Sequence, residues 1–334
     1  MAVVSFSLAD IESVLIICGP TAIGKTGVAM AVQDALGGPD CAQLISADSA
    51  LIYRGMDIGT AKPSSEELQA YPHKLIDIRD PSETYSAADF VADADAAILQ
   101  AVADGKKPVV VGGTMMYLKC LLEGIANLPP TDAGMRAVLE QELEKKGAAA
   151  LHAELLQSDP RAAVAIHPNN HQRLLRALAV TRATGFALSE QWTSHAGGTL
   201  HERTGLKSQT LVMLPKDRSL LHQRIGQRFE QMLLQGSLAE VEGLVGRGGL
   251  HRGMPSMRAV GYRQAIAHLL GECDHAEFVE QGLAATRQLA KRQLTWLRKW
   301  SDAYVVVSDD PEDARNAVLE GLNAYARSPG PALL

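Results

Sequence analysis

A glycine-rich segment near the N-terminus has the spacing of a phosphate-binding loop. Gly19-Pro-Thr-Ala-Ile-Gly24-Lys25-Thr26 matches the pattern GxxxxGK[ST] at every fixed position. In such a loop, backbone N–H groups and a helix N-terminus bind phosphate oxygens, the lysine adds positive charge, and the Thr26 hydroxyl can bind Mg²⁺. The motif does not say whether a phosphoryl group is transferred, a nucleotide is hydrolysed or pyrophosphate leaves.

The acidic residue that could work with this loop stands in an unusual position. Nucleotide hydrolases and motors usually have an apolar strand ending in Asp, which holds the metal, but here the run 108–111 is followed by Gly112-Gly113-Thr114. Asp48 instead follows an earlier apolar run and begins a polar loop that extends to Pro63. Asp48 could act as a general base on an acceptor within hydrogen-bond reach, or it could simply cap a turn.

Alternating strands and helices must position these residues. Apolar runs at 14–18, 43–45, 75–78 and 108–111 predict strands, and helical patterns cover 25–36 and 86–103. This alternation predicts a doubly wound parallel sheet, in which ligands bind at the carboxyl ends of the strands. Later runs at 209–213 and 304–307 predict two more strands, with a helix at about 219–235 between them.

The composition changes between about residues 129 and 203. Ala, Leu, Glu, Arg and His dominate this region, and 135–146 and 171–184 have helical periods. We therefore predict an α/β protein. Its P-loop core, residues 1–128 and 204–334 with C-terminal helices, is interrupted by an all-helical insertion domain at 129–203.

The composition also excludes some classes of protein. The 334 residues are 46% hydrophobic and 21% charged, which is typical of a soluble α or α/β protein. We find neither an apolar run long enough to span a membrane nor a signal peptide, and the four cysteines stand too far apart for a zinc pair or a disulfide framework. A cytoplasmic location is expected.

Six segments carry longer motifs. They are residues 19–26, ISADSALIYRGMDIGTAKP at 45–63, VGGT at 111–114, HPNNHQRLLR at 167–176, VGYR at 260–263 and TRQLAKRQLTWLR at 286–298. In this order, from about residue 13 to 300, they resemble bacterial tRNA dimethylallyltransferases. That family moves a dimethylallyl group from its diphosphate to the exocyclic N6 amine of adenosine 37, beside the anticodon.

The resemblance explains how a phosphate-binding loop could serve an enzyme that transfers no phosphoryl group. In this family the loop would bind pyrophosphate, which is the leaving group. It implies Mg²⁺ as cofactor, and dimethylallyl diphosphate and the anticodon stem-loop of tRNA as substrates. It suggests no protein partner, so a monomer is the default expectation.

The resemblance also assigns roles to residues. Asp48 would accept a proton from the amine, Thr114 would hold donor and acceptor in line, and Arg224 would bind the diphosphate, although Arg228 lies on the same helix face and spacing does not choose between them. The diphosphate-binding set is Gly19, Pro20, Thr21, Ala22, Ile23, Gly24, Lys25 and Thr26, with Thr26 also binding Mg²⁺. The tRNA-binding set is Asp48, Ser49, Ala50, Leu51, Gln172, Arg173, Leu174, Leu175, Arg176, Arg258, Gly261, Tyr262, Arg263, Lys291, Arg292, Gln293 and Arg298.

The charge distribution agrees with a nucleic-acid substrate. The net charge is −6, yet residues 160–189, 243–271 and 281–301 contain no Asp or Glu and hold 13 of the 32 Lys and Arg. In the last stretch Arg287, Lys291 and Arg298 share one helix face, while Trp296 and Trp300 share the opposite face. This pattern predicts an outward basic face and tryptophans in the core, whereas Tyr262 could either stack on a base or pack.

Two other functions are compatible with some of these features. A small-molecule or nucleotide kinase that consumes ATP also joins a P-loop to a helical region with arginines, but it usually has the strand-end Asp that is missing here. A non-catalytic RNA-binding protein would not need Asp48 beside a complete phosphate loop.

Overall fold

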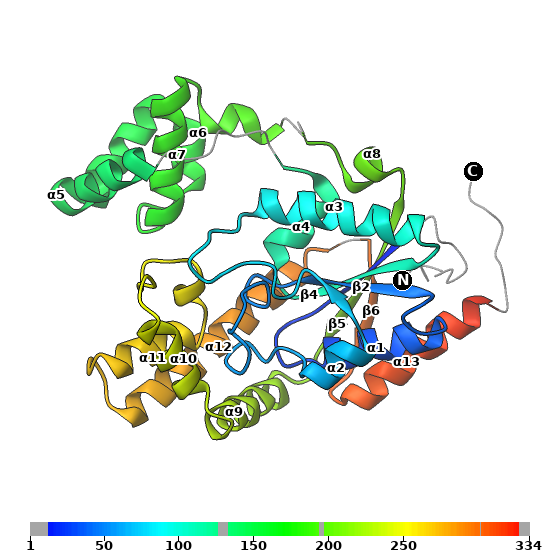
Figure 1. The fold of residues 1–334 in the computed structure, drawn as a ribbon. Coiled ribbons are helices and arrows are strands. Elements are labelled where there is room, and N and C mark those ends of the chain that lie inside the picture. The colour runs from blue at the N-terminus through cyan, green and yellow to red at the C-terminus, as the bar shows by residue number, and fades with distance from the viewer. Residues whose placement is uncertain (1–12, 126–132, 194–196, 301, 327–334) are drawn as a thin grey trace. The chain divides into compact units, whose positions relative to one another are not determined.

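The computed structural model describes residues 13–125, 133–193, 197–300 and 302–326 (Figure 1). The described chain forms two compact units. An α/β unit contains the residues up to Leu122 and from Leu200 onward, and a helical unit runs from Glu123 to Thr199. None of the helices in these ranges combines the length and apolar character that crossing a membrane would require.

The α/β unit is built on one sheet of six parallel strands in the order β3-β2-β4-β1-β5-β6. The strands are β1 (Ser13–Cys18), β2 (Ala42–Ala47), β3 (His73–Lys74), β4 (Lys107–Gly112), β5 (Lys207–Leu214) and β6 (Tyr304–Val307). This sheet, with helices packed on it, confirms the predicted α/β fold.

The register brings three strand ends to the same level. Gly112 of β4 pairs with Cys18 of β1 on one side and with Ala47 of β2 on the other. The segments that follow these strands therefore leave the sheet side by side at one edge. These are the segments that begin at Gly19, Asp48 and Gly113.

Helices of the α/β unit cover both faces of the sheet. Helix α3 contacts β2 and β4, and in Figure 1 it lies on the opposite side of the sheet from α1 and α13. The helices are α1 (Lys25–Ala35), α2 (Ser65–Ala70), α3 (Ala87–Ala103), α4 (Met115–Glu123), α8 (Leu200–Thr204), α9 (Arg218–Leu234), α10 (Ser237–Gly246), the 3₁₀ helix η2 (Ser256–Arg258), α11 (Tyr262–Leu269), α12 (His275–Leu297) and α13 (Pro311–Ala326).

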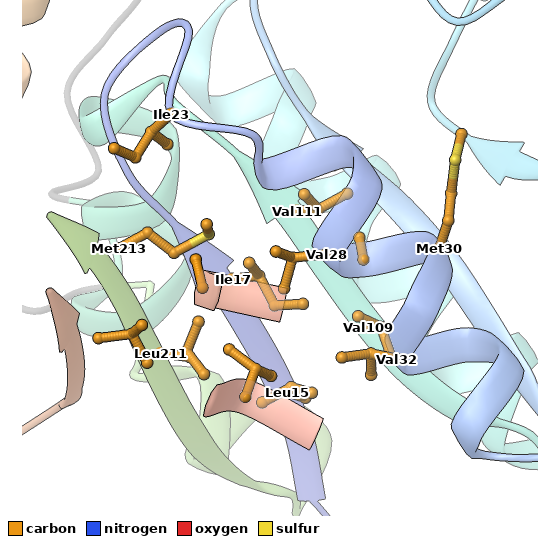
Figure 2. Close-up of a cluster of buried hydrophobic side chains, with 14 of the residues drawn as sticks. Leu15, Ile17, Ile23, Val28, Met30, Val32, Val109, Val111, Leu211 and Met213 are labelled. Atoms are coloured by element: carbon orange, nitrogen blue, oxygen red, sulfur yellow. The ribbon is translucent and has the colours of Figure 1, made fainter. Parts of the chain in front are cut away.

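A core of aliphatic side chains fixes α1 to the sheet. Val28 and Val32 of α1 meet strand residues such as Leu15 and Ile17, all of them buried (Figure 2). Ala290 and Leu294 of α12 belong to the same cluster. Burying each large aliphatic side chain contributes about 1.5–3 kcal/mol, so this cluster holds the start of α1 and the C-terminal half of α12 in fixed positions.

The helical unit has its own core. Its elements are α5 (Ala133–Ser158), α6 (Pro160–Ala165), α7 (His171–Thr184) and the 3₁₀ helix η1 (Leu188–Thr193), and α5 is interrupted at Gly147, where φ is +78°. Leu139, Leu155, Leu174 and Leu178 are among its buried residues.

One predicted strand is wrong. No strand forms at the expected residues 75–78, because β3 stops at Lys74 and both Leu75 (φ +65°) and Asp77 (φ +56°) adopt left-handed backbone conformations. The Asp77 N–H instead donates to the Leu51 carbonyl, and the Lys62 ammonium group pairs with the Asp77 carboxylate. This segment therefore supports the loop that begins at Asp48 and does not extend the sheet.

Candidate active site

The loop between β1 and α1 leaves the first turn of α1 open to an anion. Gly24 (φ +98°) precedes α1 and no side chain caps the helix there. Ala22 also has a positive φ of +63°, which shows how sharply the loop turns. Uncapped N–H groups at a helix N-terminus attract anions, so the geometry fits the predicted phosphate-binding role of this loop.

Lys25 bends back over this loop. Its Nζ atom donates to the Pro20 carbonyl at 2.8 Å. Burial lowers the pKa of Lys25 to about 8, and the nearby Arg228 adds to this effect while Asp48 opposes it. Thr26, the next residue, is exposed. The lysine charge and the threonine hydroxyl thus lie at the start of one helix, next to the loop.

Thr114 is hydrogen-bonded to the residues on both sides of Asp48, where β2 and β4 end. The Thr114 hydroxyl accepts a hydrogen bond from the Ser49 N–H at 3.0 Å, and the Thr114 N–H donates to the Ala47 carbonyl at 3.3 Å. The Asp48 carboxylate accepts from the Ala50 N–H at 2.9 Å. Asp48 therefore does stabilise its own turn, and Thr114 fixes the backbone on either side of it.

Gly112, the last residue of β4, and Gly113, the next residue, allow these segments to approach. A Cβ atom at Gly112 would lie 2.2 Å from the Ala47 carbonyl oxygen. At Gly113 it would lie 2.7 Å from Nε2 of Gln293 and 3.4 Å from Nζ of Lys25. A side chain at either position would push these segments apart, so an Asp cannot replace Gly112 or Gly113 without a shift of the backbone or of Gln293.

Of the two candidate arginines on α9, Arg228 is the one that shares an electrostatic environment with the site. Arg228 influences the pKa of Lys25, and burial lowers its own pKa while Asp48 opposes that shift. Its guanidinium donates to the Thr60 carbonyl at 3.4 Å. Arg224 instead contributes to the lowered pKa of Asp310. Between the two arginines that helix spacing left open, these electrostatic interactions favour Arg228 over Arg224.

The residues of α12 that are predicted to bind tRNA separate into two groups. Lys291 and Arg298 are exposed, as the helical pattern predicts, and Arg292 is exposed as well. Gln293 is only 6% exposed and contacts the phosphate loop and the Gly113 turn. Trp296 is half-buried, and the Lys119 ammonium lies 5.8 Å from the centre of its ring.

The segment around the start of α11 shows a similar division. Arg258 and Arg263 are exposed, whereas Tyr262 is 1% exposed and bonded to Glu240. Its side chain packs in this structure, which answers the question that the sequence left open. Gly261 has a φ of +92°, a conformation that favours glycine at this position.

In the helical unit, the predicted residues lie on α7, which Asn170 caps through the Arg173 N–H. Gln172 and Arg173 are exposed and Arg176 is half-buried. Leu174 is buried in the core of this unit, with Leu175 packed against it.

Within the described ranges, no three His, Cys, Asp or Glu side chains are grouped closely enough to hold a metal ion by themselves. The Thr26 hydroxyl, in the first turn of α1, is an oxygen ligand that the phosphate loop offers to a metal ion. Oxygen ligands of this kind suit Mg²⁺.

Sequence reasoning missed two contributions to the site. Glu240 accepts hydrogen bonds from the loop that begins at Asp48, and Gln293 contacts the phosphate loop. Glu240 has no sequence signal, because a glutamate on an amphipathic helix usually faces water. Gln293 lies within a recognised motif, and its position opposite Lys291 on α12 was the available clue.

The chain is similar to proteins of one family along most of its length. The family model described as "IPP transferase" matches residues 51–300. A tRNA dimethylallyltransferase from Chromohalobacter salexigens is 53% identical over 306 residues, which cover 92% of this chain and 95% of the relative.

Three solved structures of tRNA-prenylating enzymes are also similar to this chain. A tRNA isopentenylpyrophosphate transferase from Bacillus halodurans matches with a TM-score of 0.64 and 34% identity, covering 95% of this chain and 98% of the other. One from Staphylococcus epidermidis has a TM-score of 0.65 and 31% identity, covering 95% and 100%. A eukaryotic dimethylallyltransferase acting on tRNA has a TM-score of 0.74 and 25% identity, covering 95% and 77%.

Proposed function

The chain belongs to the IPP transferase family and is an enzyme that prenylates tRNA, and from this premise we propose its reaction and the roles of its residues. The donor is dimethylallyl diphosphate, the acceptor is the exocyclic amine of adenosine 37, and the products are N6-isopentenyladenosine and pyrophosphate. The observation that supports this reaction is the position of Asp48, beside a phosphate loop at the same sheet edge. The family match favours this reaction over the kinase alternative.

The diphosphate binds on loop 19–26. The N-terminal N–H groups of α1 and the Lys25 ammonium face the negative charge that grows on the leaving group as the C–O bond breaks. Arg228 contributes a second cation, since it already interacts with Lys25 and Asp48. Mg²⁺, held by Thr26 and the diphosphate itself, would supply further charge neutralisation when bound.

The acceptor amine lies on the side of the breaking C–O bond that is opposite to the diphosphate. Asp48 accepts a proton from the amine as the new C–N bond forms. Thr114 keeps Asp48 in position through the Ser49 N–H and the Ala47 carbonyl. Orientation of this kind lowers the entropic part of the barrier, because donor and acceptor need not find the reactive arrangement by chance.

The anticodon stem-loop binds to the exposed basic residues of α12, α11 and α7. These residues neutralise backbone phosphates, and the acceptor base leaves its stack to enter the site. The enzyme acts as a cytoplasmic monomer. The acidic remainder of the surface discourages binding of other RNA.

A direct assay tests this function. The purified protein is incubated with dimethylallyl diphosphate, Mg²⁺ and unmodified tRNA, and the nucleosides are analysed by mass spectrometry after digestion. We expect prenylated adenosine at position 37 and stoichiometric pyrophosphate. Consumption of ATP without prenylated adenosine would contradict the proposal and favour a kinase.

A further inference from the structure

The side chain of Gln293 bridges two segments of the donor site. Its Oε1 atom accepts a hydrogen bond from the Thr21 N–H at 2.9 Å, and its Nε2 atom donates to the Gly113 carbonyl at 2.8 Å. Thr21 belongs to the phosphate loop, and Gly113 follows β4. We propose that Gln293 is a positioning residue for the donor diphosphate, an inference that rests on the proposed function and assigns this residue to the donor rather than to tRNA.

An amide is the side chain that these two partners require. The Thr21 N–H needs an acceptor and the Gly113 carbonyl needs a donor, and a glutamine supplies both at its end. The side chain is only 6% exposed, so water has little access to replace either bond. Leaving a buried partner without its hydrogen bond is costly, which makes the pair sensitive to substitution.

The helix that carries Gln293 is itself fixed. Ala290 and Leu294 of α12 belong to the core cluster that also contains Leu15 and Val28 of β1 and α1. The bridge therefore connects the phosphate loop to a rigid element. Without it, the Thr21 end of the loop can move away from the Gly113 turn, and its N–H groups no longer point together at the diphosphate.

The same helix connects the donor site to the predicted tRNA surface. Lys291 of α12 and Arg298, the residue that follows this helix, are exposed, while Gln293 points into the protein. A substitution at 293 should therefore change the donor affinity and leave the tRNA affinity unaltered. A direct tRNA contact by Gln293 would give the opposite result.

The first experiment compares Q293M with a matched control, Q288M. Methionine has nearly the volume of glutamine but neither hydrogen-bonding group, and Gln288 is exposed on the same helix. Binding of pyrophosphate with Mg²⁺ is measured by calorimetry, and tRNA binding by filter retention. We expect Q293M to bind pyrophosphate roughly tenfold more weakly and tRNA as the wild type does, with Q288M unchanged in both. Unaltered pyrophosphate affinity in a folded Q293M overturns the inference.

A second variant, Q293E, decides the question if Q293M does not fold. An ionised Glu at 293 accepts from Thr21 but cannot donate to Gly113, and it adds negative charge beside the diphosphate. A protonated Glu can do both, and burial raises its pKa. The ratio of the Q293E to the wild-type dissociation constant for pyrophosphate should therefore exceed roughly tenfold at about pH 8 and fall towards one at about pH 5.5. A ratio that does not depend on pH overturns the inference.

The design separates this inference from the proposed function. Pyrophosphate binding needs no turnover, whereas the proposed function is tested by prenylated adenosine from the wild-type protein. If the wild type is active and Q293M binds pyrophosphate as tightly as the wild type, only the role of Gln293 is contradicted. If the wild type does not prenylate tRNA, the proposed function is contradicted. The pyrophosphate affinities of the variants still test whether the hydrogen bonds of Gln293 to Thr21 and Gly113 support phosphate binding.

Discussion

Tyr262 donates its hydroxyl hydrogen to the Glu240 carboxylate, with 2.5 Å between the two oxygens. The same carboxylate accepts the N–H groups of Asp57, Ile58 and Gly59 at 2.7–3.0 Å. A Cβ atom at Gly59 would lie 2.8 Å from the tyrosine ring. Helices α10 and α11 thus hold the far end of the loop that begins at Asp48.

Replacing Tyr262 by Phe tests this interpretation. Y262F removes the hydroxyl but keeps the ring, so Glu240 loses a hydrogen-bond donor and the free energy of unfolding should fall by about 1–2 kcal/mol. Thermal unfolding measures the loss, and tRNA affinity should not change. An unaltered Tm would mean that the Tyr262–Glu240 pair does not stabilise the loop.

The two arginines of α9 give a second prediction. R228Q should raise the KM for dimethylallyl diphosphate and lower kcat, because Arg228 shares the electrostatic environment of Lys25 and Asp48. We expect a loss of about 10²-fold or more in kcat/KM, the size of effect seen when a charge-stabilising donor is removed. R224Q is the matched control, with a smaller effect. A larger loss in R224Q than in R228Q would instead support Arg224, the residue that the family resemblance implies.

Local sequence patterns predicted most of the fold. The strand at 304–307 and the helix at 171–184 have the predicted bounds, and β1 and α1 were found to within one residue. These elements depend on side-chain periodicity and on glycine at the phosphate loop, both of which are visible in a short window. The predicted strand at 75–78 failed because Leu75 and Asp77 follow the loop beside them, and apolar character alone does not reveal that.

The supporting contacts of the site could not be predicted in this way. Gln293 meets Thr21 across 272 positions of the chain, and Glu240 meets Asp57 across 183. Such pairs are set by how helices pack on the sheet, and no local period encodes them. The motif around Gln293 identified an important helix but not which of its residues contact the phosphate loop.

Asp48 provides the third prediction. D48N keeps an acceptor for the Ala50 N–H, so its turn should persist, but it cannot accept a proton from the amine. Turnover on tRNA should fall by about 10²- to 10⁴-fold with little change in pyrophosphate or tRNA affinity. Single-turnover kinetics with radiolabelled donor would measure the chemical step. Near-normal turnover in D48N would exclude Asp48 as the base.

Lys25 gives a prediction about pH. Because its pKa is lowered to about 8, the free protein loses this charge as the pH rises above that value. A bound diphosphate favours the protonated lysine and raises its pKa. The contribution of Lys25 to pyrophosphate affinity should therefore not change with pH below about pH 8, and it should decrease as the pH rises above that value. Calorimetry across this range measures the effect. K25M is the control, because its affinity changes with the ionisation of pyrophosphate but not with that of Lys25. Identical pH profiles for the wild type and K25M would contradict a role for the Lys25 charge in binding.

The basic face of α12 supplies the last prediction. Lys291 and Arg298 are exposed on it, and if they contact backbone phosphates, replacing each by Gln should weaken tRNA binding and reduce the slope of log K against log salt by about one unit. Pyrophosphate affinity should not change, because both side chains are exposed, whereas the buried Gln293 contacts the phosphate loop. R315Q, at an exposed position on α13, is the control and should keep the wild-type slope. Equal slopes for all these proteins would show that the α12 residues are only solvated, since a phosphate contact cannot be lost without releasing fewer counterions.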